Sequence, residues 1–209
     1  YYNERYQTNF KVIRNLPFAN HEKKAETGID PKGRKILIYQ GALNIGRGLE
    51  LVLDTMTYLD NHLLLIIGSG DVEAQLLEKS RKLQLEDKVR FMGRMDPNEL
   101  KKNTIQADLG FSLEEDLGLN YRFALPNKIF DYIQAEVPVI ISDLPEMKDL
   151  MQHYNFGEVI VARNPKDLAL QIESILLKNF KAPLKKAKKD LVWENEKQHL
   201  IAIFENLDC

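Results

Sequence analysis

Four residues near the middle of the chain could together hold a phosphorylated sugar: Pro126, Asn127, Lys128 and Asp131. Proline favours the first position of a helix, so we expect a helix that begins at Pro126. The free N–H groups and positive dipole end of that helix suit a phosphate, and the Lys128 ammonium adds a full charge there. Asp131 lies on the same helix face, where a carboxylate can accept hydrogen bonds from sugar hydroxyls. The spacing predicts a site for a diphosphate joined to a ribose.

A second cation, Arg47, stands between Gly46 and Gly48, and glycines let the backbone approach a ligand closely. A solvated loop arginine is the alternative interpretation, and these residues alone do not decide between the two. Lys128 and Asp131 also have a plainer explanation, because a surface ion pair three residues apart on a helix contributes only ~0.3 kcal/mol.

Three carboxylates, Glu114, Glu115 and Asp116, follow a short apolar run. Open α/β sheets bind ligands at the carboxyl ends of their strands, so this position raises the prospect of a functional role above that of an ordinary polar loop. Gly68 and Gly70 also follow an apolar run, but Glu73 replaces the third glycine of a dinucleotide fingerprint. We therefore expect a turn that opens the next helix, with contact to a nucleotide as a secondary role of Gly68.

Short apolar runs alternate with stretches of helical period along most of the chain. Their brevity and their bounding turn residues indicate strands that are buried on both faces. Asp96 before Pro97 predicts the N-cap and first residue of one intervening helix. The pattern predicts an α/β fold with a doubly wound, mostly parallel six-stranded sheet and helices on both faces. The expected strands are Ile36–Tyr39, Leu63–Ile67, Val89–Phe91, Leu109–Ser112, Val139–Ile141 and Val159–Val161.

The composition is that of an ordinary globular protein, with 209 residues, 44% hydrophobic and 29% charged residues. A formal net charge of −2 argues against a dedicated nucleic-acid binder. The single cysteine, Cys209, favours a reducing compartment, and the apolar runs are too short to span a bilayer, so we expect a cytoplasmic protein. The four histidines show no metal-ligand spacing, and we expect no metal site: His21, His62, His153 and His199.

The order of these motifs resembles the C-terminal, donor-binding domain of the group 1 (family 4) glycosyltransferases, which have the GT-B fold and a Rossmann-like donor half. The resemblance covers roughly residue 34 to the end of the chain. The motifs that carry it are Tyr39-Gln40-Gly41, Gly46-Arg47-Gly48-Leu49-Glu50, Ile67-Gly68-Ser69-Gly70, Val89-Arg90-Phe91-Met92-Gly93, Ala107-Asp108, Pro126-Asn127-Lys128 with Asp131-Tyr132, and Val137-Pro138-Val139-Ile140.

The resemblance implies a UDP- or GDP-sugar as donor, retention of anomeric configuration, and no metal or other cofactor. It implies that Arg47 and Lys128 clamp the diphosphate and stabilise it as the leaving group. Asp131 takes the place of an acid, usually glutamate, that binds the ribose. The remaining donor-binding residues implied or expected are Gly41, Gly46, Gly48, Gly68, Phe91, Arg94, Glu114, Glu115 and Asn127, with the base near Phe91 to Arg94.

The chain departs from the family pattern at two positions. Phe123 stands where the first of two spaced glutamates is usual, and Ala42 follows Gly41 where an arginine is usual. The resemblance therefore assigns residues to the diphosphate and the ribose but not to the two departing positions close to the sugar. A nucleotide-sugar 2-epimerase of the same fold and a non-catalytic nucleotide-binding module remain the alternatives.

The resemblance also implies a domain layout. Residues 1–33 would be a hinge from a missing acceptor-binding domain, residues 34–180 the nucleotide-sugar domain, and residues 181–209 helices that cross back. The acceptor would be a glycan or a lipid-linked glycan in polysaccharide or glycolipid synthesis, and this chain alone would transfer little or nothing. The lysine-rich stretch from Lys178 to Lys189 is most simply a solvated helix face, with weak attachment to an anionic membrane surface as the sharper alternative.

Overall fold

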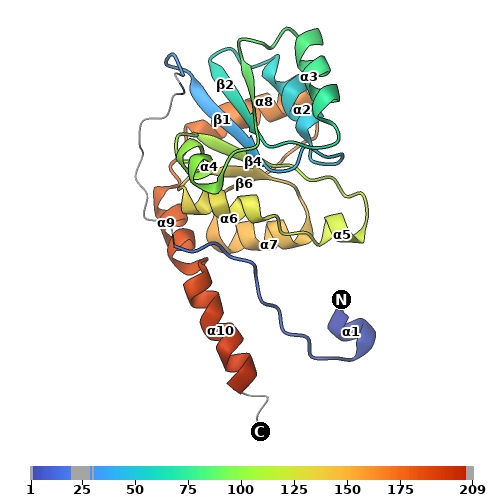
Figure 1. Ribbon diagram of the computed structural model, residues 1–209, viewed down its shortest axis with the longest axis vertical. Coiled ribbons are helices and arrows are strands. Elements are labelled where there is room, and N and C mark those ends of the chain that lie inside the picture. Colours follow the sequence, from blue (N-terminus) through green and yellow to red (C-terminus); the bar gives the residue numbers. More distant parts are fainter. Residues whose placement is uncertain (1, 20–28, 30, 206–209) are drawn as a thin grey trace.

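The computed structural model describes residues 2–19, 29 and 31–205, so Cys209, His21 and part of the expected hinge lie outside the described residues. Within them the strands form one six-stranded parallel sheet in the order β3-β2-β1-β4-β5-β6 (Figure 1). This confirms the predicted doubly wound α/β fold. The strands are β1 Lys35–Gln40, β2 His62–Ile67, β3 Val89–Gly93, β4 Leu109–Ser112, β5 Val139–Ile141 and β6 Gly157–Val159.

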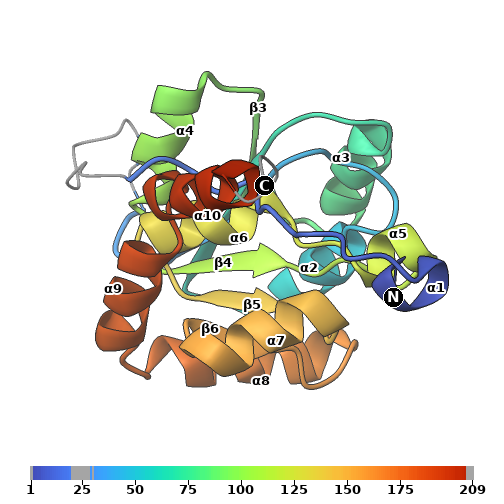
Figure 2. The ribbon, with the colours of Figure 1, turned by 90° about the horizontal axis from the view of Figure 1, so that it is seen from below.

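Helices cover both faces of the sheet, because alternate side chains of each strand point to opposite sides. Leu37 and Tyr39 of β1 belong to one apolar cluster with α2, α3 and α8, whereas Ile36 and Ile38 belong to a second cluster with α4, α6, α7 and α9. Figure 2 shows the strands lying between helices when the molecule is seen from below. The helices are α1 Tyr2–Tyr6, α2 Leu49–Met56, α3 Glu73–Lys82, α4 Pro97–Thr104, α5 Leu119–Arg122, α6 Asn127–Gln134, α7 Pro145–Tyr154, α8 Pro165–Leu176, α9 Lys181–Asp190 and α10 Trp193–Glu205.

The last strand lies two residues earlier than predicted. The run that starts at Val159 was expected to form it, but β6 begins at Gly157, and Val161 is 80% exposed. The Gly157 backbone packs so closely on β5 that an added Cβ would lie 2.0 Å from the carbonyl oxygen of Val139. An edge strand that contains a glycine and a glutamate has no continuous apolar run, which is why the pattern misplaced it.

Two predicted helix starts differ in outcome. Asp96 is the N-cap of α4, where its carboxylate accepts hydrogen bonds from the backbone N–H groups of Asn98 and Glu99, as predicted. Pro126 was expected at the first helical position of α6, but it is the extended N-cap residue, and the helix begins at Asn127. Proline has no backbone N–H. Neither the N-cap nor the first helical position uses its N–H in a hydrogen bond within the helix, so either position suits a proline.

The N-terminal segment and the start of α10 lie side by side on one side of the domain. The backbone N–H of Trp193 donates to the carbonyl of Pro17 at 2.8 Å, and the Glu196 carboxylate accepts from the N–H of Arg14 at 2.7 Å. Helix α9 packs on the domain through the buried Leu184 and Ala187, and α10 then projects away from it (Figure 1). None of the helices in the described part of the chain combines the length and apolarity needed to cross a membrane.

The winding of the sheet reverses between β1 and β4, which are neighbours at its centre. The connections from β1 and from β4 leave on opposite faces, so a crevice opens at the carboxyl ends of these two strands. The glycine-flanked loop 41–48, the carboxylate run 114–116 and the start of α6 all follow one of these strands. The topology therefore brings the three motifs to one edge of the sheet.

Candidate functional site

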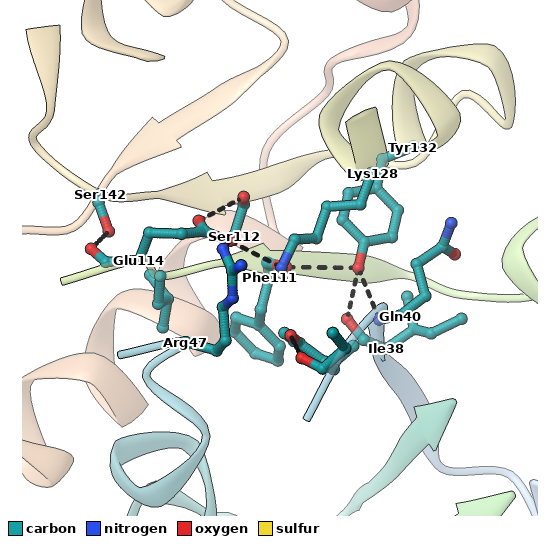
Figure 3. A network of polar contacts seen from close by, with 12 residues as sticks. Ile38, Gln40, Arg47, Phe111, Ser112, Glu114, Lys128, Tyr132 and Ser142 are labelled. Atoms are coloured by element: carbon teal, nitrogen blue, oxygen red, sulfur yellow. Dashed lines mark hydrogen bonds and ion pairs between the residues drawn. The ribbon is translucent and has the colours of Figure 1, made fainter. Parts of the chain in front are cut away.

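Two cations and one carboxylate meet at this edge (Figure 3). The Nζ of Lys128 lies 2.7 Å from Oε1 of Glu114, and Nη1 of Arg47 lies 3.6 Å from the same oxygen. Lys128 comes from the first turn of α6, Arg47 from the loop after β1, and Glu114 from just beyond β4. The structure thus brings together both residues that the sequence assigned to the diphosphate, and it joins them through Glu114.

Glu114 is held in place by hydrogen bonds to neighbouring residues. Its carboxylate has no exposed surface, and Oε2 accepts a 2.7 Å hydrogen bond from the Ser112 hydroxyl. Its main-chain carbonyl accepts from the Ser142 hydroxyl and from Nη2 of Arg163, each at 2.6 Å. These contacts determine where the carboxylate points before any ligand arrives.

The Lys128 side chain is 9% exposed, and its ammonium lies 4.3 Å from the centre of the Tyr39 ring. Burial lowers the pKa of Lys128, Glu114 opposes that shift, and Arg47 adds to it. Burial together with the Glu114 charge raises the pKa of Tyr39, whose hydroxyl donates to the carbonyl of Ala42. Lys128 is therefore a cation in a poorly solvated position, with its counterion in direct contact.

The glycines beside Arg47 are explained by packing within the chain. Gly48 has a φ of 72°, and an added Cβ would lie 2.5 Å from the carbonyl oxygen of Leu113. The carbonyl of Gly46 accepts a 2.9 Å hydrogen bond from the backbone N–H of Glu115. The loop after β1 thus lies directly against the end of β4, and this contact carries Arg47 to Glu114.

Gly41 and Gly68 lie back to back at the ends of β1 and β2. A Cβ on Gly68 would lie 1.9 Å from the carbonyl oxygen of Gly41, so the glycine at 68 is required by its neighbouring strand. A Cβ on Gly41 would meet nothing closer than the Tyr39 hydroxyl at 3.8 Å and Nζ of Lys128 at 4.0 Å. Gly41 therefore borders the charged cluster, whereas Gly68 supports it from the adjacent strand.

Asp131 faces a different neighbour from Lys128. Its Oδ2 accepts a 3.1 Å hydrogen bond from Nε2 of Gln40, and Oε1 of Gln40 accepts one of 2.7 Å from the Thr104 hydroxyl. Burial raises the pKa of Asp131, and the bond from Gln40 and the charge of Lys101 oppose the shift. Asp131 and Gln40 line a hollow of about 150 Å³ between α4 and α6. The simple Lys128–Asp131 surface pair is thus not what the structure contains, since each residue has its own partner.

The remaining predicted residues lie at varying distances along this edge. Asn127 is exposed at the start of α6, and Glu115 is half-buried beside the loop after β1. Phe91 lies on β3 and packs against the core, and Arg94 is exposed just beyond the same strand. Two strands, β2 and β1, separate β3 from β4. Phe91 and Arg94 are therefore not brought to the charged cluster.

Several residues of the site were missed by the sequence analysis. Gln40 belongs to one of the sequence motifs, but no role was predicted for it. It is a polar residue at the carboxyl end of a buried strand where the winding of the sheet reverses, and such a position indicates a ligand site. Ser112 and Ser142 end β4 and follow β5 in the same way. Arg163 carried no such signal, because it acts through the carbonyl of a residue that is distant in sequence. Across the described ranges, no cluster of three or more His, Cys, Asp or Glu side chains is arranged to hold a metal ion.

Comparisons with known proteins identify the family of the chain. The sequence model of the family described as glycosyl transferases group 1 matches residues 20–191. A chitobiosyldiphosphodolichol beta-mannosyltransferase from Candida albicans is 26% identical over 212 aligned residues, which cover 94% of this chain and 46% of that protein. The chain spans between 36% and 46% of the length of the curated relatives reported.

Solved structures show the same fold at low sequence identity. Sucrose-phosphate synthase from Thermosynechococcus elongatus superposes with a TM-score of 0.74 at 17% identity, over 99% of this chain and 55% of the other. The Anabaena protein HepE, solved in complex with UDP, superposes with a TM-score of 0.71 at 13% identity, over 84% of this chain and 50% of the other. At such identities the likeness establishes the architecture alone.

Proposed function

Because the chain belongs to the glycosyl transferases of group 1, we propose that it is the donor-binding domain of a retaining, metal-independent glycosyltransferase that uses a nucleoside-diphosphate sugar. The observation that carries the proposal is the meeting of Arg47 and Lys128 at the crevice between β1 and β4. Two fixed cations beside the N-terminus of α6 suit the two phosphates of such a donor. Complexes of the structural neighbour HepE with UDP and with UDP-glucose support the choice of ligand.

The proposed chemistry follows from where charge develops. Transfer breaks the bond between the anomeric carbon and a diphosphate oxygen, and the bonding electrons leave with the diphosphate. Arg47 and Lys128 stabilise that charge in a site that is already arranged for it, a role that Mg²⁺ fills in metal-dependent enzymes. The first backbone N–H groups of α6 and the Asn127 amide add neutral donors.

Asp131 is proposed to bind the ribose hydroxyls. It lies one helical turn beyond Lys128 and lines a hollow with Gln40, so a ribose attached to a diphosphate at Lys128 could reach it. Phe91 and Arg94 stay as the proposed neighbours of the base. The base itself, uracil or guanine, is left to experiment.

The wider role is proposed from the relatives. We propose a cytoplasmic enzyme of polysaccharide or glycolipid synthesis, with the acceptor held by a further domain that residues 1–33 and 181–209 connect to this one. The name of the Candida albicans relative refers to a lipid-linked diphospho-glycan, which supports a lipid-linked acceptor. The projection of α10 away from the sheet supports its contact with another domain (Figure 1).

Calorimetric titration of this chain with UDP, GDP and NAD tests the donor site. One nucleoside diphosphate should bind, and Arg47→Ala should weaken that binding by at least about tenfold, since a hydrogen bond to a charged group contributes roughly 1.5–3 kcal/mol. Replacing Lys128 alone would strand the buried Glu114, so the double variant Lys128→Met/Glu114→Gln is the sounder probe and should weaken binding at least as much. NAD should bind no better than either diphosphate.

Exposed cations on α3 provide the controls, because Arg81 and Lys82 lie away from the crevice. Arg81→Ala and Lys82→Met should leave the affinity unchanged. Binding that ignores the substitutions at Arg47 and Lys128, or the lack of any diphosphate binding, would refute the clamp.

Reaction with the full-length protein separates the proposed transferase from an epimerase. The anomeric configuration of the product, read from the proton coupling by NMR, should match that of the donor. A free sugar nucleotide that is changed only at C2 would identify an epimerase instead.

A further inference from the structure

Glu114 cannot touch a donor in the arrangement observed. Its side chain has no exposed surface, one carboxylate oxygen is bonded to the Ser112 hydroxyl, and the other faces Lys128 and Arg47. Any effect of Glu114 on a bound diphosphate must therefore pass through the two cations.

The charges around Lys128 show what that effect is. Lys128 and Arg47 contribute two positive charges and Glu114 one negative charge, which leaves one net positive charge at the cluster. The other ionisable groups around Lys128 and Glu114 are the Tyr39 and Tyr132 hydroxyls and the Arg163 guanidinium. Burial raises the pKa of both tyrosines, so they stay neutral, and Arg163 binds the main-chain carbonyl of Glu114 and not its carboxylate. Glu114 is thus the sole carboxylate in ion-pair contact with Lys128 among the described residues.

Without that carboxylate, a buried ammonium would lie beside an arginine. Arginine does not release its proton in proteins, so Lys128 would be the group that becomes neutral. A neutral amine attracts a diphosphate far less than an ammonium does. The site would then hold one cation at neutral pH where it now holds two.

We propose that Glu114 is a positioning residue of the diphosphate site, which keeps Lys128 protonated and aligns it with Arg47 before the donor binds. The assignment rests on the proposed function of the site. It explains why Glu114 is anchored through both its side chain and its backbone, by the Ser112 hydroxyl on Oε2 and by Ser142 and Arg163 on its main-chain carbonyl. A counterion that must hold one cation from a loop and another from the start of a helix has to be fixed itself.

The experiment compares UDP and GDP binding to wild type and to Glu114→Gln between pH 6 and pH 9 by calorimetry. The ratio of the two affinities at each pH cancels the ionisation of the ligand. At pH 6 the variant should bind within about threefold of wild type, and at pH 9 at least about tenfold more weakly, because a lysine with a lowered pKa loses its charge as the pH rises. Glu114→Asp, which keeps the charge, should show a ratio that does not change with pH.

Glu78→Gln is the matched control, because Glu78 forms an exposed ion pair with Lys82 on α3. Its affinity ratio should be constant and close to one. A constant ratio for Glu114→Gln would overturn the proposal even if wild type binds the diphosphate well. Failure of wild type to bind either diphosphate would instead remove the proposed function, and this inference with it.

A folding defect in Glu114→Gln is excluded by circular dichroism before each titration. If that variant does not fold, the lysine side chains of wild type and Glu114→Asp can be titrated by NMR. Lys128 should stay protonated at pH 8 in both proteins. A Lys128 that is neutral at pH 8 while Glu114 is present would refute the proposal.

Discussion

Lys128 shows how one side chain can serve ligand binding at the expense of stability. Moving an ammonium out of water is unfavourable, and its pairing with a buried carboxylate only partly offsets that penalty. The lowered pKa of Lys128 reflects this imbalance, since burial outweighs the stabilising charge of Glu114. A leucine or methionine would fill the same space without either charge. The pair is therefore best understood as part of the site and not as a device for stability.

We predict that Lys128→Met lowers the free energy of unfolding by about 3–5 kcal/mol, because it leaves the buried Glu114 carboxylate with the more distant Arg47 as its only cationic contact. The double variant Lys128→Met/Glu114→Gln should recover most of that loss, since it removes both charges. Urea unfolding followed by circular dichroism measures all three proteins. Lys82→Met, which breaks an exposed pair, should unfold like wild type. A single variant as stable as wild type would contradict the burial of the pair.

The ends of the strands show how packing between elements positions the site. Three neighbouring turns follow β1, β2 and β4, and three of their glycines lie against backbone atoms of another turn: Gly68 against Gly41, Gly70 against Leu43 and Gly48 against Leu113. No other residue could occupy these positions without moving a strand end. Because Arg47 directly precedes Gly48 and Glu114 directly follows Leu113, any such movement would separate the charges of the site.

Gly68→Ala tests this packing, with Gly118→Ala as a matched control. The two glycines have similar φ angles, 141° and 148°, but an added Cβ would meet the Gly41 carbonyl in one case and open space in the other. We expect Gly118→Ala to lower the free energy of unfolding by about 1–2 kcal/mol from backbone strain alone, and Gly68→Ala by at least about 3 kcal/mol. Thermal or urea unfolding gives the comparison. Equal losses would show that the collision is relieved without moving the strand.

The molecule as a whole is a sheet between two apolar cores, and polar groups inside those cores make its stability depend on pH. His62, at the start of β2, is 3% exposed, and neither ring nitrogen has a hydrogen-bond partner among the described residues. Burial lowers its pKa, although Glu173, 3.8 Å away, opposes the shift. The folded protein therefore holds His62 in its neutral form.

We predict that this histidine makes the fold sensitive to mild acid. Below a pH of about 6.5 the unfolded chain binds a proton at His62 that the folded chain refuses, so stability falls as pH decreases from 6.5 towards the lower folded pKa. His62→Leu should flatten the change in unfolding midpoint between pH 7 and pH 5. His199→Leu, on the exposed side of α10, should follow wild type. A variant at His62 with the wild-type slope would show that other groups cause the acid sensitivity.

The amino-acid sequence alone predicts much of this organisation. The central strands are short apolar runs, and the rule that parallel strands need crossovers of one hand then leaves few ways to arrange them. β4 and β5 appear at the predicted residues, and the N-cap at Asp96 has the predicted bonds. The edge strand β6 was misplaced, because its pairing depends on a glycine and not on an apolar run.

Local pattern was enough to pick out Arg47 and Lys128, because a helix start and a glycine-flanked loop have recognisable residue types. Their common partner was not readable in the same way. Glu114 was one of three adjacent carboxylates, and its partners come from the loop after β1 and from the start of α6, which only the folded chain brings together. Periodicity and capping act over a few residues, so sequence specifies strands, helices and their turns. The choice of partner for a buried charge is made by the whole folded sheet, since only there do the desolvation and the opposing charges act together.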